Sequence, residues 1–322
     1  MRLISARTAA GETLGVVVGD GWRAAAELLD GGPRTMADLL AAGPDTLIDL
    51  AAAAASATNI SSSSPASPVA PPVAHALEET ELLAPLPRPG KVVAIGRNYR
   101  EHADEEGVDP PPAPLVFAKW PSSVVGPNAD IRWDPALTQQ VDYEAELAVV
   151  IGRTARNVTV DGALDHVFGY TCLDDVSARD IQFGDGQWVR GKSLDTFCPM
   201  GPWLVTADEI PDPQALAISC RVNEDVLQDS HTSQMYFGVA EIISYVSRSF
   251  TLEPGDVIAT GTPGGVGVFR DPPRFLGEGD VVTVEIERIG RLVNTCRFEA
   301  GAAGEVTAAR AADTAATTTA AR

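Results

Sequence analysis

The stretch "VDYEAELAVVIG", residues 141–152, places an acid at every second position of a segment that is otherwise largely apolar. Side chains of a strand alternate between its two faces, so Asp142, Glu144 and Glu146 are predicted to share one face. Like charges a few ångströms apart repel each other. Either water surrounds this face, or a cation lies among the carboxylates.

The composition around this stretch is typical of a globular protein that buries a sizeable core. The chain has 322 residues, of which 45% are hydrophobic and 21% charged, enough for one large domain with a smaller one beside it. Its net charge of −20 would repel a phosphate backbone, so we expect no nucleic-acid partner.

The cysteines and the hydropathy pattern indicate the compartment. Four cysteines lie far apart without CxxC spacing, which argues against a zinc site and against a disulfide framework. The sequence starts without the apolar run of a signal peptide and contains no run of 18 apolar residues. We therefore expect a cytoplasmic protein with no membrane partner.

The chain is predicted to divide into four segments. Residues 1–52 form a small α/β domain, with strands in "LISA" and "TLGVVVGDGWRAA" and a helix in "TMADLLAAG" that Thr35 caps and Gly43 ends. Residues 53–78, rich in Ala, Ser and Pro, are predicted to be a linker. Residues 300–322 have a similar bias and are predicted to be a disordered tail.

The remaining segment, residues 79–299, is predicted to be the main domain. Short apolar runs bounded by Gly, Pro and Asp indicate strands in "KVVAIG", "PLVFAKW", "AELAVVIG", "ALAISCRVN", "DVIATG" and "DVVTVEIERIG". Only "MYFGVAEIISYVSRS" shows a clear helical period. Many strands, few helices and no regular alternation predict an α+β fold that is mainly β.

A third acid decides between water and a cation at the opening stretch. Glu144 and Glu146 can both remain ionised if they share Mg²⁺ or Mn²⁺, which favour oxygen ligands, but the pair alone also fits a solvent-facing strand. "GYTCLDDVSARDIQ", residues 169–182, offers Asp175 at the end of a strand-like run. Its three aspartates could equally cap the following turn.

Three further segments carry groups that could act on a substrate. Lys192 could stabilise an oxyanion beside a metal, although alone it fits an ordinary surface lysine. His102 and Glu105 share one face if "IGRNYREHADEEG" is helical, so they form either a general-base dyad or part of an acidic surface helix. "TGTPGG" lacks the GK[ST] of a P-loop but could offer N–H groups and Thr262 to a carboxylate.

In this order the segments resemble the fumarylacetoacetate hydrolase family. The resemblance spans roughly residues 91–270 and is carried by "GRNYREHADEEG", "PLVFAKWPSSVVGP", "DYEAELAVVIG", "GYTCLDDVSARDIQ", "RGKSLDTFCPMGPW" and "LEPGDVIATGTPGGVGVF". It implies a mixed β-roll catalytic domain with a small N-terminal domain. It also implies a homodimer with Mg²⁺ or Mn²⁺ in each site.

The resemblance also implies the roles of ten residues. The metal ligands would be Glu144, Glu146 and Asp175. The catalytic residues would be Lys192 beside the metal and the dyad of His102 and Glu105 on a lid segment. The substrate contacts would be Lys119, Arg179, Gln182 and Thr262.

The implied substrates are 2-oxo acids with a second carbonyl or carboxylate two carbons further on. We expect hydrolysis of a C–C bond in an acylpyruvate-like 2,4-dioxo acid through a metal-bound enolate, with His102 taking a proton from water. Because other reactions share the enolate, decarboxylation of oxaloacetate or a related β-keto acid, and isomerisation of a 2-hydroxy-dienedioate, stay open. A non-catalytic member that binds a metal or a small acid is the alternative of a different class.

Overall fold

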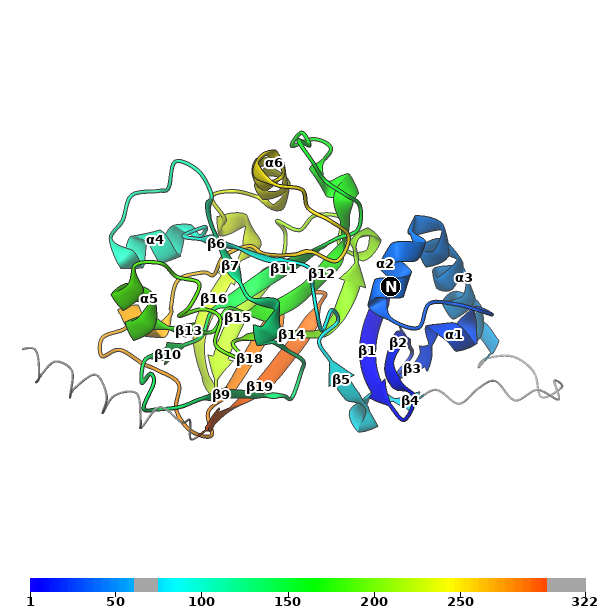
Figure 1. Ribbon diagram of the computed structural model, residues 1–322, viewed down its shortest axis with the longest axis horizontal. Coiled ribbons are helices and arrows are strands. Elements are labelled where there is room, and N and C mark those ends of the chain that lie inside the picture. Colours follow the sequence, from blue (N-terminus) through cyan, green and yellow to red (C-terminus); the bar gives the residue numbers. More distant parts are fainter. Residues whose placement is uncertain (61–74, 300–322) are drawn as a thin grey trace, which may run out of the picture.

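The structure of the chain, a computed structural model, describes residues 1–60 and 75–299 (Figure 1). Sheets dominate these residues and few helices accompany them, which confirms the α+β, mainly β class. The predicted tail, residues 300–322, lies outside the described residues. No single described helix is long and apolar enough to cross a membrane, and α2 with part of α3 passes that test only as a pair bent by 119°.

The described strands and helices follow in chain order. The strands are β1 (Arg2–Thr8), β2 (Gly11–Val18), β3 (Gly21–Ala24), β4 (His75–Ala76), β5 (Glu81–Leu83), β6 (Val92–Gly96), β7 (Leu115–Lys119), β8 (Val124–Val125), β9 (Asp130–Trp133), β10 (Val141–Asp142), β11 (Ala145–Ile151), β12 (Val167–Asp174), β13 (Ser177–Ala178), β14 (Cys198–Thr206), β15 (Ala217–Val222), β16 (Asp225–His231), β17 (Val257–Ala259), β18 (Val281–Ile286) and β19 (Gly290–Phe298). The α-helices are α1 (Ala25–Leu28), α2 (Met36–Ala42), α3 (Pro44–Ile60), α4 (Arg100–Glu106), α5 (Arg179–Asp185) and α6 (Val239–Ser249). The short 3₁₀ turns are η1 (Leu77–Glu79), η2 (Pro121–Ser123), η3 (Ala163–His166), η4 (Ala207–Glu209), η5 (Thr232–Gln234) and η6 (Gly267–Phe269).

Three sheets contain these strands. The largest has the order β4-β3-β2-β1-β14-β12-β11-β17-β6-β7, with β5 also paired to β1 and β8 to β14. A second has the order β16-β15-β18-β19-β9, and β10 pairs with β13 in a third. The central pair β11 and β12 runs antiparallel in the middle of the largest sheet (Figure 1).

The opening stretch forms two strands rather than the single strand predicted. Tyr143 and Glu144 separate β10 from β11, and β10 pairs with β13 instead of continuing in the large sheet. The carboxylate of Asp142 accepts hydrogen bonds from the backbone N–H groups of Tyr143, Gly267 and Val268, at 2.7–3.0 Å. A side chain that binds nearby backbone donors in this way competes with the regular ladder of a sheet.

Strand β11 lies between two hydrophobic cores. Leu147 and Val149 on one face pack in the core of the main domain. Ala148 and Val150 on the other face pack in a second core that includes residues of the N-terminal unit. Glu146 is the first residue of β11 on this second face. The acids therefore lie at the start of β11, before the residues that pack in the second core.

The N-terminal unit is built much as its sequence predicts. Thr35 Oγ1 accepts from the Asp38 N–H at 3.1 Å, the Asp38 carboxylate accepts from the Thr35 N–H at 3.0 Å, and Gly43 ends α2, as expected. Helix α3 was not predicted. Because its alanine run has high helix propensity, it continues past residue 52, so residues 53–60 of the predicted linker are helical.

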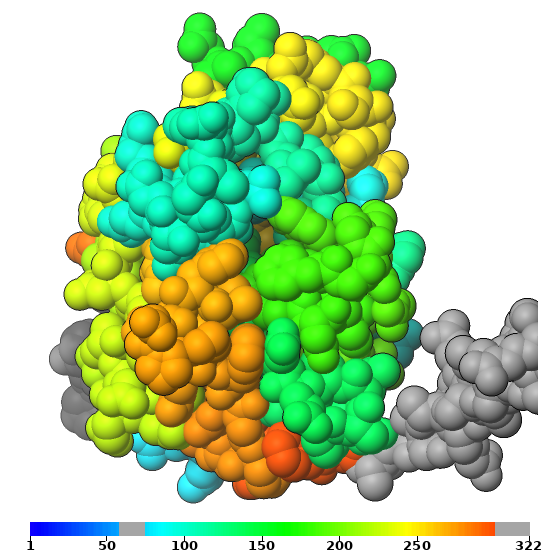
Figure 2. Space-filling view, turned by 90° about the vertical axis from the view of Figure 1, so that its left-hand side faces the viewer, coloured from blue at the N-terminus to red at the C-terminus, as the bar shows by residue number. Residues whose placement is uncertain are grey.

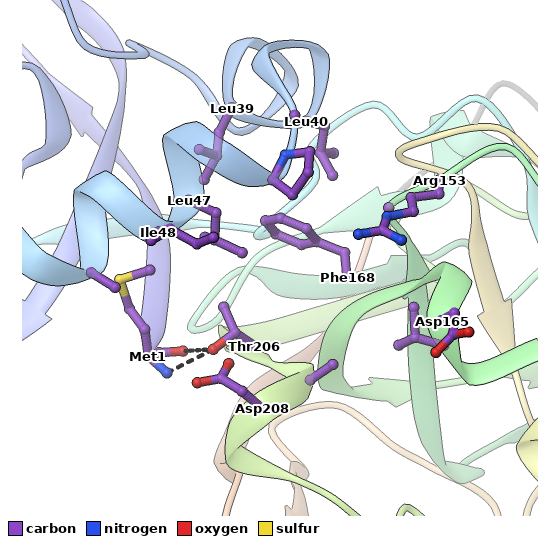
Figure 3. Close-up of a pocket in the computed structure, with 16 residues that line it drawn as sticks. Met1, Leu39, Leu40, Leu47, Ile48, Arg153, Asp165, Phe168, Thr206 and Asp208 are labelled. Atoms are coloured by element: carbon purple, nitrogen blue, oxygen red, sulfur yellow. Dashed lines mark hydrogen bonds between the residues drawn. The ribbon is translucent and has the colours of Figure 1, made fainter.

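This unit shares a sheet and a core with the main domain. β1 pairs with β14, and the Met1 ammonium donates to Thr206 Oγ1 at 2.7 Å. A cavity of about 370 Å³ lies beside this junction, where Leu47 and Phe168 face each other (Figure 3). None of the ten residues with predicted site roles lines this cavity.

Candidate active site

Three acids from two neighbouring strands converge on one point. Glu144 precedes β11, Glu146 lies within it, and Asp175 follows β12 directly. One carboxylate oxygen of each lies within 4.8 Å of the other two, and all three residues are buried. The antiparallel register that pairs Ala145 with Asp174 brings these positions together.

Asp174 holds the two ligand segments in place rather than capping a turn. Its carboxylate accepts from the Glu144 N–H at 2.9 Å, while the Glu144 carbonyl accepts from the Asp175 N–H at 2.9 Å. Burial raises the pKa of Asp174 to about 7. Asp180 accepts from Thr138 Oγ1 at 2.6 Å instead of joining the group.

Buried cations surround the acids. Lys192 Nζ lies 2.7 Å from Glu144 Oε2 and 2.8 Å from Asp175 Oδ2. Arg179 Nη1 lies 2.8 Å from Glu144 Oε1, and Lys119 Nζ lies 2.6 Å from Asp175 Oδ1. Lys192 therefore lies beside the predicted ligands, as the resemblance implied.

The cations do not balance the acids. The buried acids of this region are Asp142, Glu144, Glu146, Asp174 and Asp175, and the buried cations are Lys119, Arg179 and Lys192. If all were ionised, two negative charges would remain uncompensated. Buried charges are stable only when they are paired, neutralised or bound to a metal. A single divalent cation would supply the missing charge.

The pKa values of the two glutamates shift in opposite directions. Burial alone would raise the pKa of Glu144, but the charges of Lys192 and Arg179 outweigh it and lower the pKa to about 2. Burial raises the pKa of Glu146 well above its usual range, and the charges of Asp175 and Glu144 add to the rise. Glu146 is thus the acid that most lacks a cation.

The donor set fits a hard divalent cation. All three groups offer carboxylate oxygens, which Mg²⁺ and Mn²⁺ prefer. The oxygens of Glu144 and Asp175 that contact lysine or arginine keep further lone pairs, because each carboxylate has about four acceptor sites. The residues present therefore suit Mg²⁺ or Mn²⁺ without distinguishing them.

The predicted dyad is assembled on α4. His102 Nδ1 lies 2.7 Å from Glu105 Oε1, and Glu105 Oε2 accepts from the Gly265 N–H at 2.7 Å. His102 Nε2 lies 3.4 Å from Glu106 Oε1, so both ring nitrogens face a carboxylate. The Phe269 ring lies against His102, with 6.0 Å between ring centroids.

One cavity of about 250 Å³ joins the dyad to the acid cluster. Figure 2 shows its side of the molecule, where segments around α4, around α5 and around η6 meet at a hollow. The predicted site residues that line it are His102, Glu144, Glu146, Arg179, Gln182, Lys192 and Thr262. Asp175 and Glu105 hold these residues from behind the lining.

Two of the predicted substrate contacts differ in how they are placed. Arg179 donates from Nε to Asp142 Oδ2 at 2.8 Å and from Nη1 to Gln182 Oε1 at 3.0 Å. Its Nη2 is buried and has no hydrogen-bond partner among the described residues, so it is a free donor at the cavity. Lys119 does not line the cavity, because its ammonium lies behind Asp175 and also donates to the carbonyl of Val176.

Sequence reasoning missed several residues of the cavity. Glu106 lies one helical turn after His102, a spacing that the sequence already contained. Arg97 forms an ion pair with Glu106 Oε2 at 2.7 Å. Phe117 and Trp188 come from distant segments and pack edge to face, with centroids 5.3 Å apart. Nothing in the local sequence indicates that these two rings meet.

Comparisons with known proteins match these features. A family model described as the C-terminal part of fumarylacetoacetate (FAA) hydrolase matches residues 91–297. The chain is 51% identical over 218 residues to the mitochondrial oxaloacetate tautomerase FAHD2A of Bos taurus, covering 67% of this chain and 69% of that protein.

Two solved structures are similar over nearly the whole chain. One is a fumarylacetoacetate hydrolase from Exiguobacterium antarcticum, with a TM-score of 0.78 and 37% identity over 93% of this chain and 100% of that one. Another is a 2-hydroxyhepta-2,4-diene-1,7-dioate isomerase from Mycobacterium marinum, with a TM-score of 0.70 and 34% identity over 94% and 100%.

Proposed function

The chain belongs to the fumarylacetoacetate hydrolase family, and from that premise we propose that it is a divalent-metal-dependent enzyme that interconverts the enol and keto forms of a dicarboxylic 2-oxo acid such as oxaloacetate. The observation that carries the proposal is the three-carboxylate cluster, which opens into the same cavity as the His102 ring. The names of the tautomerase and the dienedioate isomerase both specify substrates with two carboxylates.

The buried cations position the substrate in this proposal. The free Nη2 of Arg179 donates to the carboxylate next to the 2-oxo group, because a buried donor without a partner is costly until an anion binds. Glu144, Glu146 and Asp175 hold the divalent cation, which when bound polarises the 2-oxo group as a Lewis acid. Lys192, already beside the ligands, stabilises negative charge on that oxygen.

His102 moves the proton. The Glu105 carboxylate fixes the ring through Nδ1, which leaves Nε2 to exchange a proton with the substrate. In the enol-to-keto direction, the enol hydroxyl loses its proton and carbon 3 gains one, so the overall composition does not change. Glu106, 3.4 Å from Nε2, stabilises the protonated ring between the two transfers.

Hydrolysis of a C–C bond in an acylpyruvate is the second candidate. The observation that favours it is the His102–Glu105 pair, because tautomerisation needs only a proton carrier whereas hydrolysis needs a base that activates water. The solved structure named as a fumarylacetoacetate hydrolase is also similar over 93% of this chain. Decarboxylation of oxaloacetate would release CO₂ and leave a pyruvate enolate, and isomerisation of a 2-hydroxy-dienedioate would need only proton transfer, so both belong in the same assay.

The decisive experiment is a metal-dependence assay with a substrate panel. The protein should accelerate the ketonisation of enol-oxaloacetate, which ultraviolet absorbance measures. Treatment with EDTA and dialysis should abolish this acceleration, and addition of Mg²⁺ or Mn²⁺ should restore it. Acetylpyruvate, fumarylpyruvate and a 2-hydroxy-dienedioate are assayed in parallel, with metal alone and with Glu144→Gln protein as blanks. Hydrolysis of an acylpyruvate without ketonisation would favour the second candidate. Turnover of none would favour a binding protein.

A further inference from the structure

Cationic side chains line the cavity at two places. At one place they contact the acid cluster, and at the other they do not. Arg97, Arg179 and Lys192 are its cationic lining residues apart from His102. Arg179 and Lys192 both contact Glu144 directly. Arg97 contacts none of the three ligand acids, because its ion pair is with Glu106 on α4.

An aromatic wall separates the two places. Lys192 Nζ lies 5.2 Å from the centroid of the Phe117 ring, and that ring packs against Trp188. The Arg97 guanidinium lies 5.9 Å from the centroid of the Trp188 ring. The order from the acid cluster outward is therefore cation, two rings, cation. Such a lining suits a ligand with an anionic group at each end and a flat, less polar middle.

Arg97 also has donors to spare. Its Nε lies 2.7 Å from Glu106 Oε2, but the two are not aligned as a hydrogen bond, and the guanidinium donates no hydrogen bond to any described residue. Guanidinium has five N–H donors in a planar fork that matches a carboxylate. Arg97 can therefore bind a second carboxylate without leaving Glu106.

The backbone fixes where this guanidinium lies. Arg97 has a φ of 56°, in the left-handed region that residues other than glycine seldom adopt. The next residue, Asn98, holds that geometry, since its side-chain amide donates to the Thr260 carbonyl at 2.8 Å and its Oδ1 accepts from the Phe237 N–H at 2.9 Å. Unusual backbone conformations that neighbours enforce in this way cluster at binding sites.

We propose that Arg97 determines substrate specificity by binding the second carboxylate of a dicarboxylic 2-oxo acid whose first carboxylate lies beside Arg179. This inference rests on the proposed function, since it assumes that a 2-oxo acid occupies the cavity. The Arg97 side chain would then be the residue that makes acylpyruvates with uncharged tails bind less tightly than diacids. The negative charge of Glu106, which stays beside Arg97, repels the second carboxylate and so limits how tightly the diacid binds.

The test measures binding of matched, non-reacting analogues to the full chain loaded with Mg²⁺. N-oxalylglycine and its homologues with two and three methylene groups mimic diacids of increasing length, and the N-alkyl oxamates of equal chain length lack only the second carboxylate. Isothermal titration calorimetry gives each dissociation constant. We expect the diacid of the best length to bind roughly 10- to 100-fold more tightly than its partner, the range for a charged hydrogen-bonded pair.

Four variants locate this preference. Arg97→Gln should weaken binding of the diacid by that factor and leave binding of the oxamate unchanged. Arg97→Lys should give an intermediate dissociation constant for the diacid, because lysine keeps the charge but lacks the planar fork of N–H donors. Glu106→Gln should make the diacid bind more tightly. Arg190→Gln removes an exposed arginine whose one ion-pair partner among the described residues is Asp185, and it should change neither constant.

The outcomes separate this inference from the proposed function. Equal weakening of diacid and oxamate in Arg97→Gln, or no weakening at any length, would overturn the role of Arg97 while the function stands. If wild-type protein bound neither series in the presence of Mg²⁺, the proposed function itself would fail.

Discussion

The two glutamates of the acid cluster differ in how their charge is balanced. Glu144 lies between Arg179 and Lys192, whereas Glu146 accepts a hydrogen bond from the Gly261 N–H at 2.8 Å and forms no ion pair with a described residue. Removing an acid therefore has opposite consequences at the two positions. The simple expectation that any loss of charge relieves repulsion holds only for Glu146.

In metal-free protein, Glu144→Gln should lower the free energy of unfolding by about 1.5–3 kcal/mol, because Lys192 and Arg179 each lose one of the two carboxylates that they contact. Glu146→Gln should raise it, by roughly 1.4 kcal/mol for each pKa unit by which burial disfavours the ionised form. Urea unfolding at neutral pH measures both. Each variant should also lose Mg²⁺ binding in calorimetry. Destabilisation by Glu146→Gln would contradict the charge count.

The dyad histidine should matter for turnover and not for the metal. His102→Gln removes the proton carrier but none of the three ligand carboxylates, so we expect turnover to fall by roughly 10²–10⁴ with Mg²⁺ affinity unchanged. Steady-state kinetics and calorimetry measure the two quantities. His166→Gln, a change at a histidine outside the cavity, is the control. A rate equal to wild type would remove His102 from the mechanism.

At the scale of elements, α4 is held over the cavity by the loop that follows β17 and by strand β16. Glu105 accepts from the Gly265 N–H, and Glu101 Oε2 accepts from Ser230 Oγ at 2.7 Å. A Cβ at Gly264 would lie 2.9 Å from Glu101 Cβ and 3.1 Å from its carbonyl carbon. The glycine allows the loop and the helix to approach this closely.

Gly264→Ala should displace α4 and with it His102. A displacement of about 1 Å at a catalytic group can lower the reaction rate by up to 10²-fold. We therefore expect kcat to fall by roughly tenfold or more, with Mg²⁺ affinity unchanged. Gly184→Ala on α5 meets no atom within 4 Å and is the matched control. If both variants kept wild-type kcat, the contact would not position the dyad.

At the scale of the whole molecule, the N-terminal unit and the main domain share one sheet. Leu3 lies in β1 opposite Leu204 of β14, is fully buried, and packs in the core that includes Val150 of β11. Covering this face of the sheet therefore depends on both units. The acid cluster lies on strands that this shared core supports.

Leu3→Ala should destabilise the whole chain. We expect the free energy of unfolding to fall by about 2–5 kcal/mol, the range for a buried leucine. Because the core is shared, unfolding followed by circular dichroism and by tryptophan fluorescence should stay a single coincident transition. Ile48→Ala, a change at a side chain 65% exposed, should have little effect. Two separate transitions would show that the units unfold independently.

Assembly and location are also properties of the whole molecule. The homodimer and the cytoplasmic location stay predictions from the sequence. Light scattering coupled to gel filtration measures the first.

The sequence by itself determined the family and many of the elements, but neither α3 nor the break between β10 and β11 followed from it. The apolar run in "AELAVVIG", the Thr35 cap and the three-residue spacing of His102 and Glu105 are local patterns, and local patterns set local structure. The order of the motifs then identified the acids, because a set of residues in fixed order is specific even where each residue alone is not.

Only the tertiary structure decided how the charges pair and what surrounds them. Glu144 and Glu146 are alike in sequence, yet their pKa values move in opposite directions, because Lys192 and Arg179 form ion pairs with Glu144 and not with Glu146. The pairing of Arg97 with a wall of Phe117 and Trp188 joins residues up to 91 positions apart. Coulomb interactions and desolvation depend on distance in space and on exclusion of water, and neither is fixed until the chain has packed.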